Sequence, residues 1–131
     1  MTTQITYLTF EQIIAIHEDL VEKYGGSHGV RNEGFVHSAL NRPLASFDGQ
    51  DLYTDLFIKA AGLGHSIILN HPFLDGNKRT GMVAMIIFLE LNGFKLDLKD
   101  EELVKTAVKI ATKELGLEDT ANWIKEYCVP I

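Results

Sequence analysis

Cysteine, proline and long apolar runs are scarce in this chain of 131 residues, which has one cysteine and three prolines. Cys128 has no partner for an intramolecular disulfide, which fits a reducing compartment, and we expect it as a small apolar residue in the last turn of a helix. The longest apolar run, MVAMIIFLEL, is broken by Glu90 and is shorter than the roughly 20 residues that span a membrane. We expect no signal peptide, because residues 1–10 contain neither a basic n-region nor an apolar h-region. We therefore expect a cytoplasmic protein that does not enter a membrane.

Positive charge is also in short supply, because 12 lysines and arginines stand against 18 aspartates and glutamates, a formal net charge of −6. Broad affinity for nucleic acid needs a basic surface, so we expect no direct nucleic-acid binding. This balance leaves room for a small local anion site. Apolar residues make up 46% of the chain, enough for a core, and the length suits one domain. The sequence predicts a single domain over residues 1–131.

Apolar residues recur at helical spacing along most of the chain, and no pattern supports an extended sheet. Thr9 with Gln12 is typical of a capping box at the start of a helix. Gly62 and Gly64 weaken the third helix locally, which indicates close packing against a neighbour. We expect six helices, beginning near residues 9, 32, 51, 76, 100 and 118. The fold class is therefore all-α, a compact helical bundle with at most a short β-hairpin.

The segments between and within these helices carry further expectations. The fourth helix is apolar nearly all round and should be the buried central helix. Residues 5–8 could form a short edge strand, residues 42–50 are rich in turn residues, and residues 94–98 suit an extended connector. The fifth helix should pack against the core through one apolar face, formed by Val104, Ala107, Val108, Ala111 and Leu115.

The stretch HPFLDGNKRT, residues 71–80, places ionisable chemistry between two apolar helices. Gly76 and Asn77 open the fourth helix, whose first-turn N–H groups have no internal partner and carry a partial positive charge. That geometry binds phosphate, and Gly76 lets a phosphate approach the backbone closely. Lys78 and Arg79 add two cations there, and Arg79 can hold two phosphate oxygens at once. We expect these four residues to bind a nucleotide's phosphates.

Asp75 and His71 complete the predicted chemistry. A carboxylate beside a phosphate repels it unless a Mg²⁺ lies between them, and Mg²⁺ commonly takes one or two carboxylates plus phosphates. We therefore expect Asp75 to be the metal ligand. A histidine has an ordinary pKa of about 6.5, so a largely neutral His71 can accept a proton from an attacking hydroxyl. The residues together predict ATP-dependent phosphoryl or nucleotidyl transfer with His71 as the general base.

Simpler interpretations stay open at this point. His71 and Asp75 could bind a catalytic metal as a pair, although no clear third ligand accompanies them. Lys78 and Arg79 could be ordinary surface charges. The remaining histidines are most simply structural, but His65 on the preceding helix could line the cleft.

The segment HPFLDGNKR resembles the signature of the Fic/Doc (Fido) family, His-Pro-Phe-x-Asp/Glu-Gly-Asn-x-Arg. Residues 25–43, GGSHGVRNEGFVHSALNRP, resemble the upstream block of its death-on-curing (Doc) branch. The likeness implies a Fic/Doc-like helical bundle with His71 as base, Asp75 on Mg²⁺, Gly76 and Asn77 as an anion hole and Arg79 on phosphates. It also implies a flap that aligns the target, for which residues 42–50 are the best candidate.

Two departures from the family pattern bear on the reaction. Relatives that transfer AMP have glycine where Lys78 stands and a second arginine where this chain has Met82. Without that arginine, the likeness to the Doc branch implies a protein Ser/Thr kinase that uses ATP and Mg²⁺. Its implied target is a host protein such as a translation elongation factor, whose modification inhibits translation. The alternatives are an AMP-transferase of a protein hydroxyl and a catalytically inactive binding module.

Many relatives inhibit themselves through a helix with the pattern Ser/Thr-x-x-x-Glu-Gly/Asn, and this chain has no match to it. The resemblance therefore implies that a cognate antitoxin, supplied as a separate chain, restrains the activity. Such a segment folds onto its partner on binding. The expectation is the toxin component of a type II toxin–antitoxin system.

Overall fold

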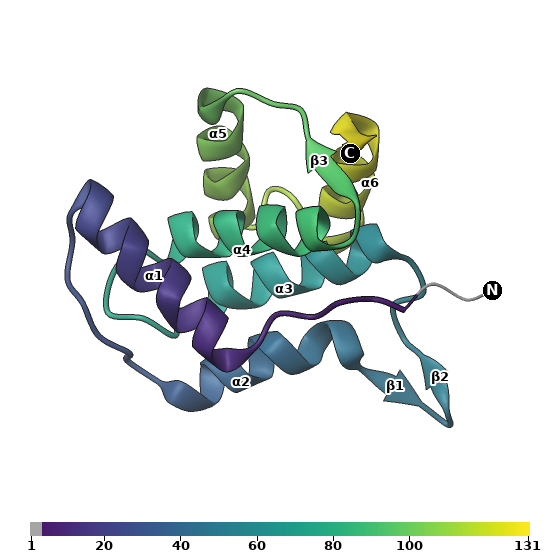
Figure 1. Ribbon diagram of the computed structural model, residues 1–131, viewed down its shortest axis with the longest axis horizontal. Coiled ribbons are helices and arrows are strands. Elements are labelled where there is room, and N and C mark those ends of the chain that lie inside the picture. The colour runs from purple at the N-terminus through teal and green to yellow at the C-terminus, as the bar shows by residue number, and fades with distance from the viewer. Residues whose placement is uncertain (1–3) are drawn as a thin grey trace.

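The computed structural model describes residues 4–131 and consists mainly of α-helices (Figure 1). Two small antiparallel sheets accompany them, β1 with β2 and β3 with β4. The helices are α1 Phe10–Tyr24, α2 Glu33–Asn41, the 3₁₀ helix η1 Arg42–Leu44, α3 Leu56–Asn70, α4 Asn77–Leu91, α5 Asp100–Ala111 and α6 Leu117–Tyr127. The strands are β1 Ser46–Phe47, β2 Gln50–Asp51, β3 Phe94–Leu96 and β4 Cys128–Pro130. The predicted all-α class is confirmed.

The antiparallel helices α3 and α4 form the centre of the molecule (Figure 1). Two glycines let them approach closely. A Cβ added to Gly81 would lie 2.6 Å from Ile68 Cγ1, and one added to Gly64 would lie 2.8 Å from Met85 Sδ. The close packing predicted from Gly64 is confirmed, whereas Gly62 lies against Arg42 instead. As predicted, α4 is buried over much of its length.

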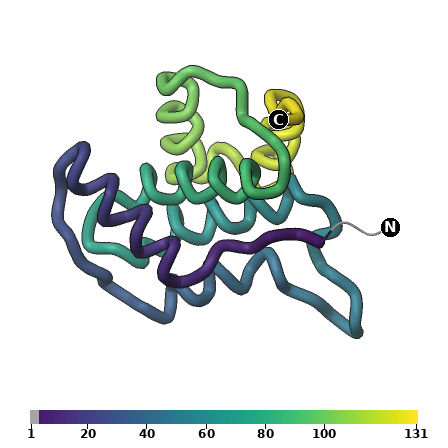
Figure 2. The backbone as a smooth tube through the Cα atoms, in the orientation of Figure 1, coloured from purple at the N-terminus to yellow at the C-terminus, as the bar shows by residue number. Residues whose placement is uncertain are grey.

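The outer helices cover this central pair on two sides. Helices α1 and α2 lie on one side, and α5 and α6 lie on the other (Figures 1 and 2). The apolar core is continuous between them and includes Ile13, Val36, Ile67, Phe88 and Ile110. Within residues 4–131, no helix combines the length and hydrophobicity needed to cross a membrane.

Local hydrogen bonds explain where the first three helices begin. The capping box of Thr9 and Gln12 is present, with both reciprocal bonds formed. Asn32 caps α2 by accepting from the Phe35 N–H at 3.1 Å. The third helix does not begin near residue 51 as predicted, because Asp55 caps it by accepting from Ile58 N–H at 2.8 Å. Residues 46–51 form the β1–β2 hairpin, which overlaps the flap predicted at residues 42–50.

Two other local expectations are wrong. Residues 5–8 form no strand, because the side chain of Asn92 bonds both the N–H and the C=O of Thr6, at 2.8 and 2.9 Å. The connector at 94–98 is extended as expected, and residues 94–96 form β3, which pairs with β4. Cys128 lies just past the last turn of α6, as its C-cap, and begins β4 opposite Leu96. It is half-buried, and burial raises the pKa of its thiol.

Candidate active site

The signature loop, residues 71–76, joins α3 to α4. His71 ends α3 in the left-handed conformation, with φ of 53° and ψ of 62°. Few residue types other than glycine adopt this region, and histidine is one of those enriched there. Its N–H bonds Ile67 O at 3.3 Å, while its side chain is exposed. The turn therefore stops the helix and leaves the imidazole accessible to a substrate.

Buried contacts fix the middle of the signature loop. Phe73 is only 1% exposed, and its ring stacks on His17 of α1 with centroids 3.9 Å apart. The Asn77 side chain accepts from the Phe73 N–H and donates to its C=O, each at 3.0 Å. His17 Nε2 lies 2.8 Å from the Asp75 carbonyl oxygen. Because a carbonyl only accepts, Nε2 must carry the hydrogen, and His17 thus ties the loop to α1.

The Asp75 carboxylate is exposed but held by two backbone donors. Oδ1 accepts from Gly76 N–H at 2.9 Å, and Oδ2 accepts from Ser27 N–H at 3.2 Å. A carboxylate has about four lone-pair positions, so two remain for a cation. Residues 4–131 contain no cluster of three acidic, histidine or cysteine side chains that could enclose a metal. One carboxylate completed by phosphates and water suits Mg²⁺, so the site fits this ion.

The N-terminus of α4 differs from the start of every other α-helix in residues 4–131. Gly76 occupies its N-cap with φ of 76° and offers no side-chain cap, and no acid lies in its first turn. Each of the other five α-helices has a side-chain cap, an acidic first turn or both. In their place α4 has Lys78 and Arg79, which are exposed. Unsatisfied N–H groups and two cations therefore coincide.

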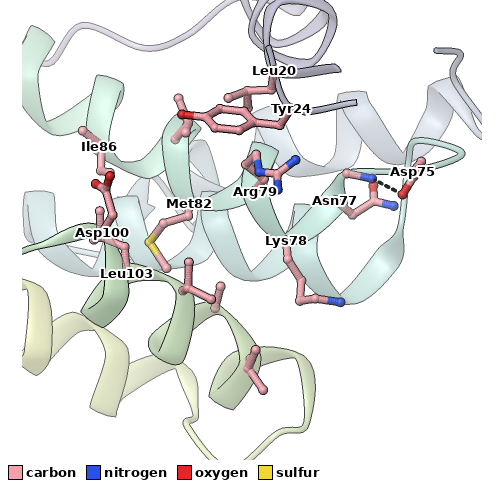
Figure 3. A pocket seen from close by; sticks show the side chains of 15 residues that line it. Leu20, Tyr24, Asp75, Asn77, Lys78, Arg79, Met82, Ile86, Asp100 and Leu103 are labelled. Atoms are coloured by element: carbon pink, nitrogen blue, oxygen red, sulfur yellow. Dashed lines mark hydrogen bonds between the residues drawn. The ribbon is translucent and has the colours of Figure 1, made fainter. Parts of the chain in front are cut away.

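A pocket of about 470 Å³ opens beside this helix start, within the range typical of ligand sites. Figure 3 shows Asp75, Asn77 and Lys78 at one end and Asp100 and Ile86 at the other. Between these ends the wall is largely apolar and comes from α1, α4 and α5, with Leu20, Tyr24, Met82, Val83, Leu103, Val104, Ala107 and Val108. The pocket thus combines a polar end at the start of α4 with a largely apolar wall.

Arg79 lies between these two parts of the pocket. Its guanidinium carbon is 4.5 Å from the centre of the Tyr24 ring (Figure 3). Cation–π contact with a tyrosine favours such an arrangement. Arg79 therefore reaches the pocket from α4, and its guanidinium group packs over the ring of Tyr24 from α1.

Five of the six predicted site residues line this pocket, and His71 does not. Asp75, Gly76, Asn77, Lys78 and Arg79 all do so, whereas His71 precedes them on the same loop. The predicted stripe of α5 is partly wrong: Val104 and Val108 are exposed and belong to the pocket wall. Their helical spacing alone could not separate a core face from a pocket face.

His65 is a structural residue of the core. It is buried, and its Nε2 lies 2.8 Å from the Thr120 hydroxyl, which donates in turn to Gly116 O. His65 does not line the pocket. Burial, with a smaller effect of the Arg42 charge, lowers the pKa of His65 to about 4.

Comparisons with known proteins identify the family of this chain. The family model for the Fic/DOC family matches residues 7–89. "Toxin Doc" of Mycolicibacterium smegmatis (strain ATCC 700084 / mc(2)155) is 37% identical over 100 residues, covering 75% of this chain and 77% of that protein. "Protein kinase doc" of Escherichia phage P1 is 29% identical over 119 residues, covering 91% and 93%. The chain therefore belongs to the Fic/DOC family, as the HPFLDGNKR segment predicted, and to its death-on-curing branch, as residues 25–43 predicted.

Proposed function

We propose that this protein is a toxin that transfers the terminal phosphoryl group of ATP to a Ser or Thr hydroxyl of a host protein. The observation that carries the proposal is the α4 N-terminus, which has cations in place of a cap or an acid and opens onto the pocket. Relatives named as a toxin and as a protein kinase support the same class of activity.

The phosphates would bind at the start of α4. The backbone N–H groups of Asn77 and Lys78 supply donors that the helix leaves unpaired, while Lys78 and Arg79 supply charge. The Asn77 side chain is already bonded to Phe73, so its contribution to phosphate binding comes from its backbone. Asp75 would hold Mg²⁺, which neutralises charge on the phosphates when bound.

His71 would act as the general base. A neutral imidazole accepts the proton of the target hydroxyl as its oxygen attacks the terminal phosphorus. The new oxygen–phosphorus bond forms as the bond to the bridging oxygen breaks, and ADP leaves with that electron pair. His71 then releases the proton to solvent, so the products are a phosphoprotein, ADP and a proton.

The residues that line the pocket favour phosphoryl transfer over AMP transfer. Among the lining residues in the described part of the chain, only Lys78 and Arg79 are lysine or arginine. Met82, one turn further along α4, is 4% exposed and contributes an apolar surface. The positive charge is therefore concentrated at the helix start, where charge developing on a transferred phosphoryl group would be stabilised. AMP transfer is the second candidate, because the same phosphate-binding residues could hold the nucleotide with its α-phosphorus, in place of its γ-phosphorus, facing His71.

A protein target and a separate antitoxin complete the proposal. The β1–β2 hairpin extends from the body (Figure 1) and carries Phe47, which is 76% exposed. It is our candidate for the flap that aligns the target hydroxyl, with a translation elongation factor as the first target to test. A purely binding role is less suited to the chain, since it would need neither His71 nor Asp75.

Labelling with two forms of ATP tests the reaction. The protein is incubated with bacterial lysate and Mg²⁺, using ATP labelled at either the γ- or the α-phosphate. We expect the γ-label to enter protein, and His71→Ala to remove it. Entry of the α-label instead would establish AMP transfer, and entry of neither would contradict the proposed reaction.

A further inference from the structure

The connector between α1 and α2, residues 25–32, runs beside the signature loop (Figure 2). Its backbone bonds that loop at several points. The N–H groups of Arg31 and Asn32 both donate to Pro72 O, at 2.7 and 3.0 Å, and Gly29 O accepts from Leu74 N–H at 3.1 Å. With the Ser27 contact to Asp75, the connector follows the loop along most of its length.

Two glycines permit this close approach. A Cβ added to Gly26 would lie 2.7 Å from Asp75 Oδ2, and one added to Gly29 would lie 2.9 Å from Leu74 Cδ1. Both glycines also have positive φ, of 109° and 124°, which other residues rarely adopt. Any larger residue at Gly26 must therefore displace the carboxylate. Gly25 has a φ of 86° as well, but a Cβ there would meet nothing within 4 Å.

The Arg31 side chain makes the contacts closest to His71. Its Nε donates to His71 O and its Nη2 donates to Asn70 O, both at 2.7 Å. These two carbonyls belong to the peptide planes on either side of the His71 Cα. Fixing both planes fixes the direction of the Cα–Cβ bond, and hence where the imidazole starts. The guanidinium is itself held over the Phe35 ring at 5.4 Å.

We infer that Arg31 is the positioning residue of His71, and that the connector 25–32 sets the geometry of the signature loop. This inference rests on the proposed function, because it assigns Arg31 an effect on the step that His71 performs. A merely structural Arg31 would cap the C-terminus of α3, so its loss would lower the thermal midpoint and leave the turnover of the folded protein unchanged. A positioning Arg31 acts on turnover as well, since a displacement of about 1 Å can cost on the order of 10²-fold in rate.

Steady-state kinetics of Arg31→Met and Arg31→Lys separate these roles. We expect Arg31→Met to lower kcat roughly 10- to 100-fold and to leave KM for ATP unchanged, because Arg31 bonds none of the phosphate-binding residues. Arg31→Lys keeps a cationic donor and should lie between Arg31→Met and wild type. Rates are corrected for the folded fraction by thermal unfolding. A wild-type kcat in Arg31→Met, or an equal loss in both variants, would overturn the inference.

A second pair of variants tests the connector without touching Arg31. Gly26→Ala and Gly25→Ala carry a similar backbone penalty, but only Gly26→Ala collides with Asp75. We expect both to lower the thermal midpoint and only Gly26→Ala to lower the turnover of the folded protein. Equal turnover in the two variants would count against the connector's role.

Hydrogen exchange provides a readout that does not depend on catalysis. The Leu74 amide, bonded to Gly29 O, should exchange faster in Arg31→Met than in wild type relative to the amides of α3. If wild type transfers no phosphate, the proposed reaction fails, while this exchange measurement still tests whether Arg31 and the connector hold the signature loop. Unchanged Leu74 exchange in Arg31→Met would overturn that role of Arg31 even if phosphoryl transfer is found.

Discussion

Helices α4 and α5 begin at opposite ends of one pocket, and their first turns carry opposite charge (Figure 3). The start of α5 contains Asp100, Glu101 and Glu102, whose negative charges are attracted by the partial positive charge of the helix N-terminus and stabilise the helix. The start of α4 contains Lys78 and Arg79, which oppose it. A helix that begins with cations gives up some stability, so the comparison supports the proposal that the α4 N-terminus is organised for an anion rather than for folding.

The largest effect is expected at His71, immediately before α4. A positioned general base contributes roughly 10²–10⁴-fold, so His71→Ala should lower phosphoryl transfer by that order and leave the thermal midpoint nearly unchanged, because the side chain is exposed. His37→Ala is the matched control, since His37 is also exposed and lies outside the pocket. Wild-type activity in folded His71→Ala would remove His71 from the reaction.

A smaller effect is expected at Arg79, within the first turn of α4. A hydrogen bond to a charged group contributes about 1.5–3 kcal/mol, so Arg79→Met should weaken ATP binding by roughly 10- to 100-fold. Asp100→Asn at the α5 end should not weaken it. Titration calorimetry measures both, and equal affinities of Arg79→Met and wild type would place the phosphates elsewhere.

How far these features could be predicted depends on whether their contacts are local. The site residues from His71 to Arg79 form one contiguous segment, so their chemistry could be recognised without a fold. The same holds for the Thr9–Gln12 capping box. His17 and Arg31 act on residues 58 and 40 positions away, and no spacing in the sequence indicates such contacts.

The errors have equally specific physical causes. Residues 5–8 have the composition of a strand, but the side chain of Asn92, 86 positions from Thr6, bonds the backbone N–H and C=O of Thr6. The apolar Leu52 extended the predicted third helix backwards, whereas the Asp55 cap starts it at Leu56. Val104 and Val108 have core chemistry yet line a pocket, because helical periodicity does not tell which apolar face is covered.

The buried His65 should make the stability of the protein depend on pH. The folded pKa of His65, about 4, lies below its ordinary value of 6.5, so the unfolded chain binds the extra proton between these values. Stability should therefore fall as pH drops from 6.5 towards 4, by up to about 3 kcal/mol from this residue. In His65→Gln, the free energy of unfolding should therefore fall less between pH 6.5 and pH 4 than it does in wild type. Identical pH dependence in the two proteins would contradict this assignment.

A charge exchange between the two helix starts gives the smallest effect on stability and the most direct test of the comparison. In Lys78→Glu, an acid replaces a cation at the α4 N-terminus, and in Glu101→Lys the reverse occurs at α5. Each change alters helix stability by about 0.3–1 kcal/mol, but in opposite directions. The account predicts that Lys78→Glu raises the thermal midpoint and abolishes ATP-dependent labelling, while Glu101→Lys lowers the midpoint and keeps labelling. A Lys78→Glu protein that is less stable, or that labels its target as wild type does, would contradict it.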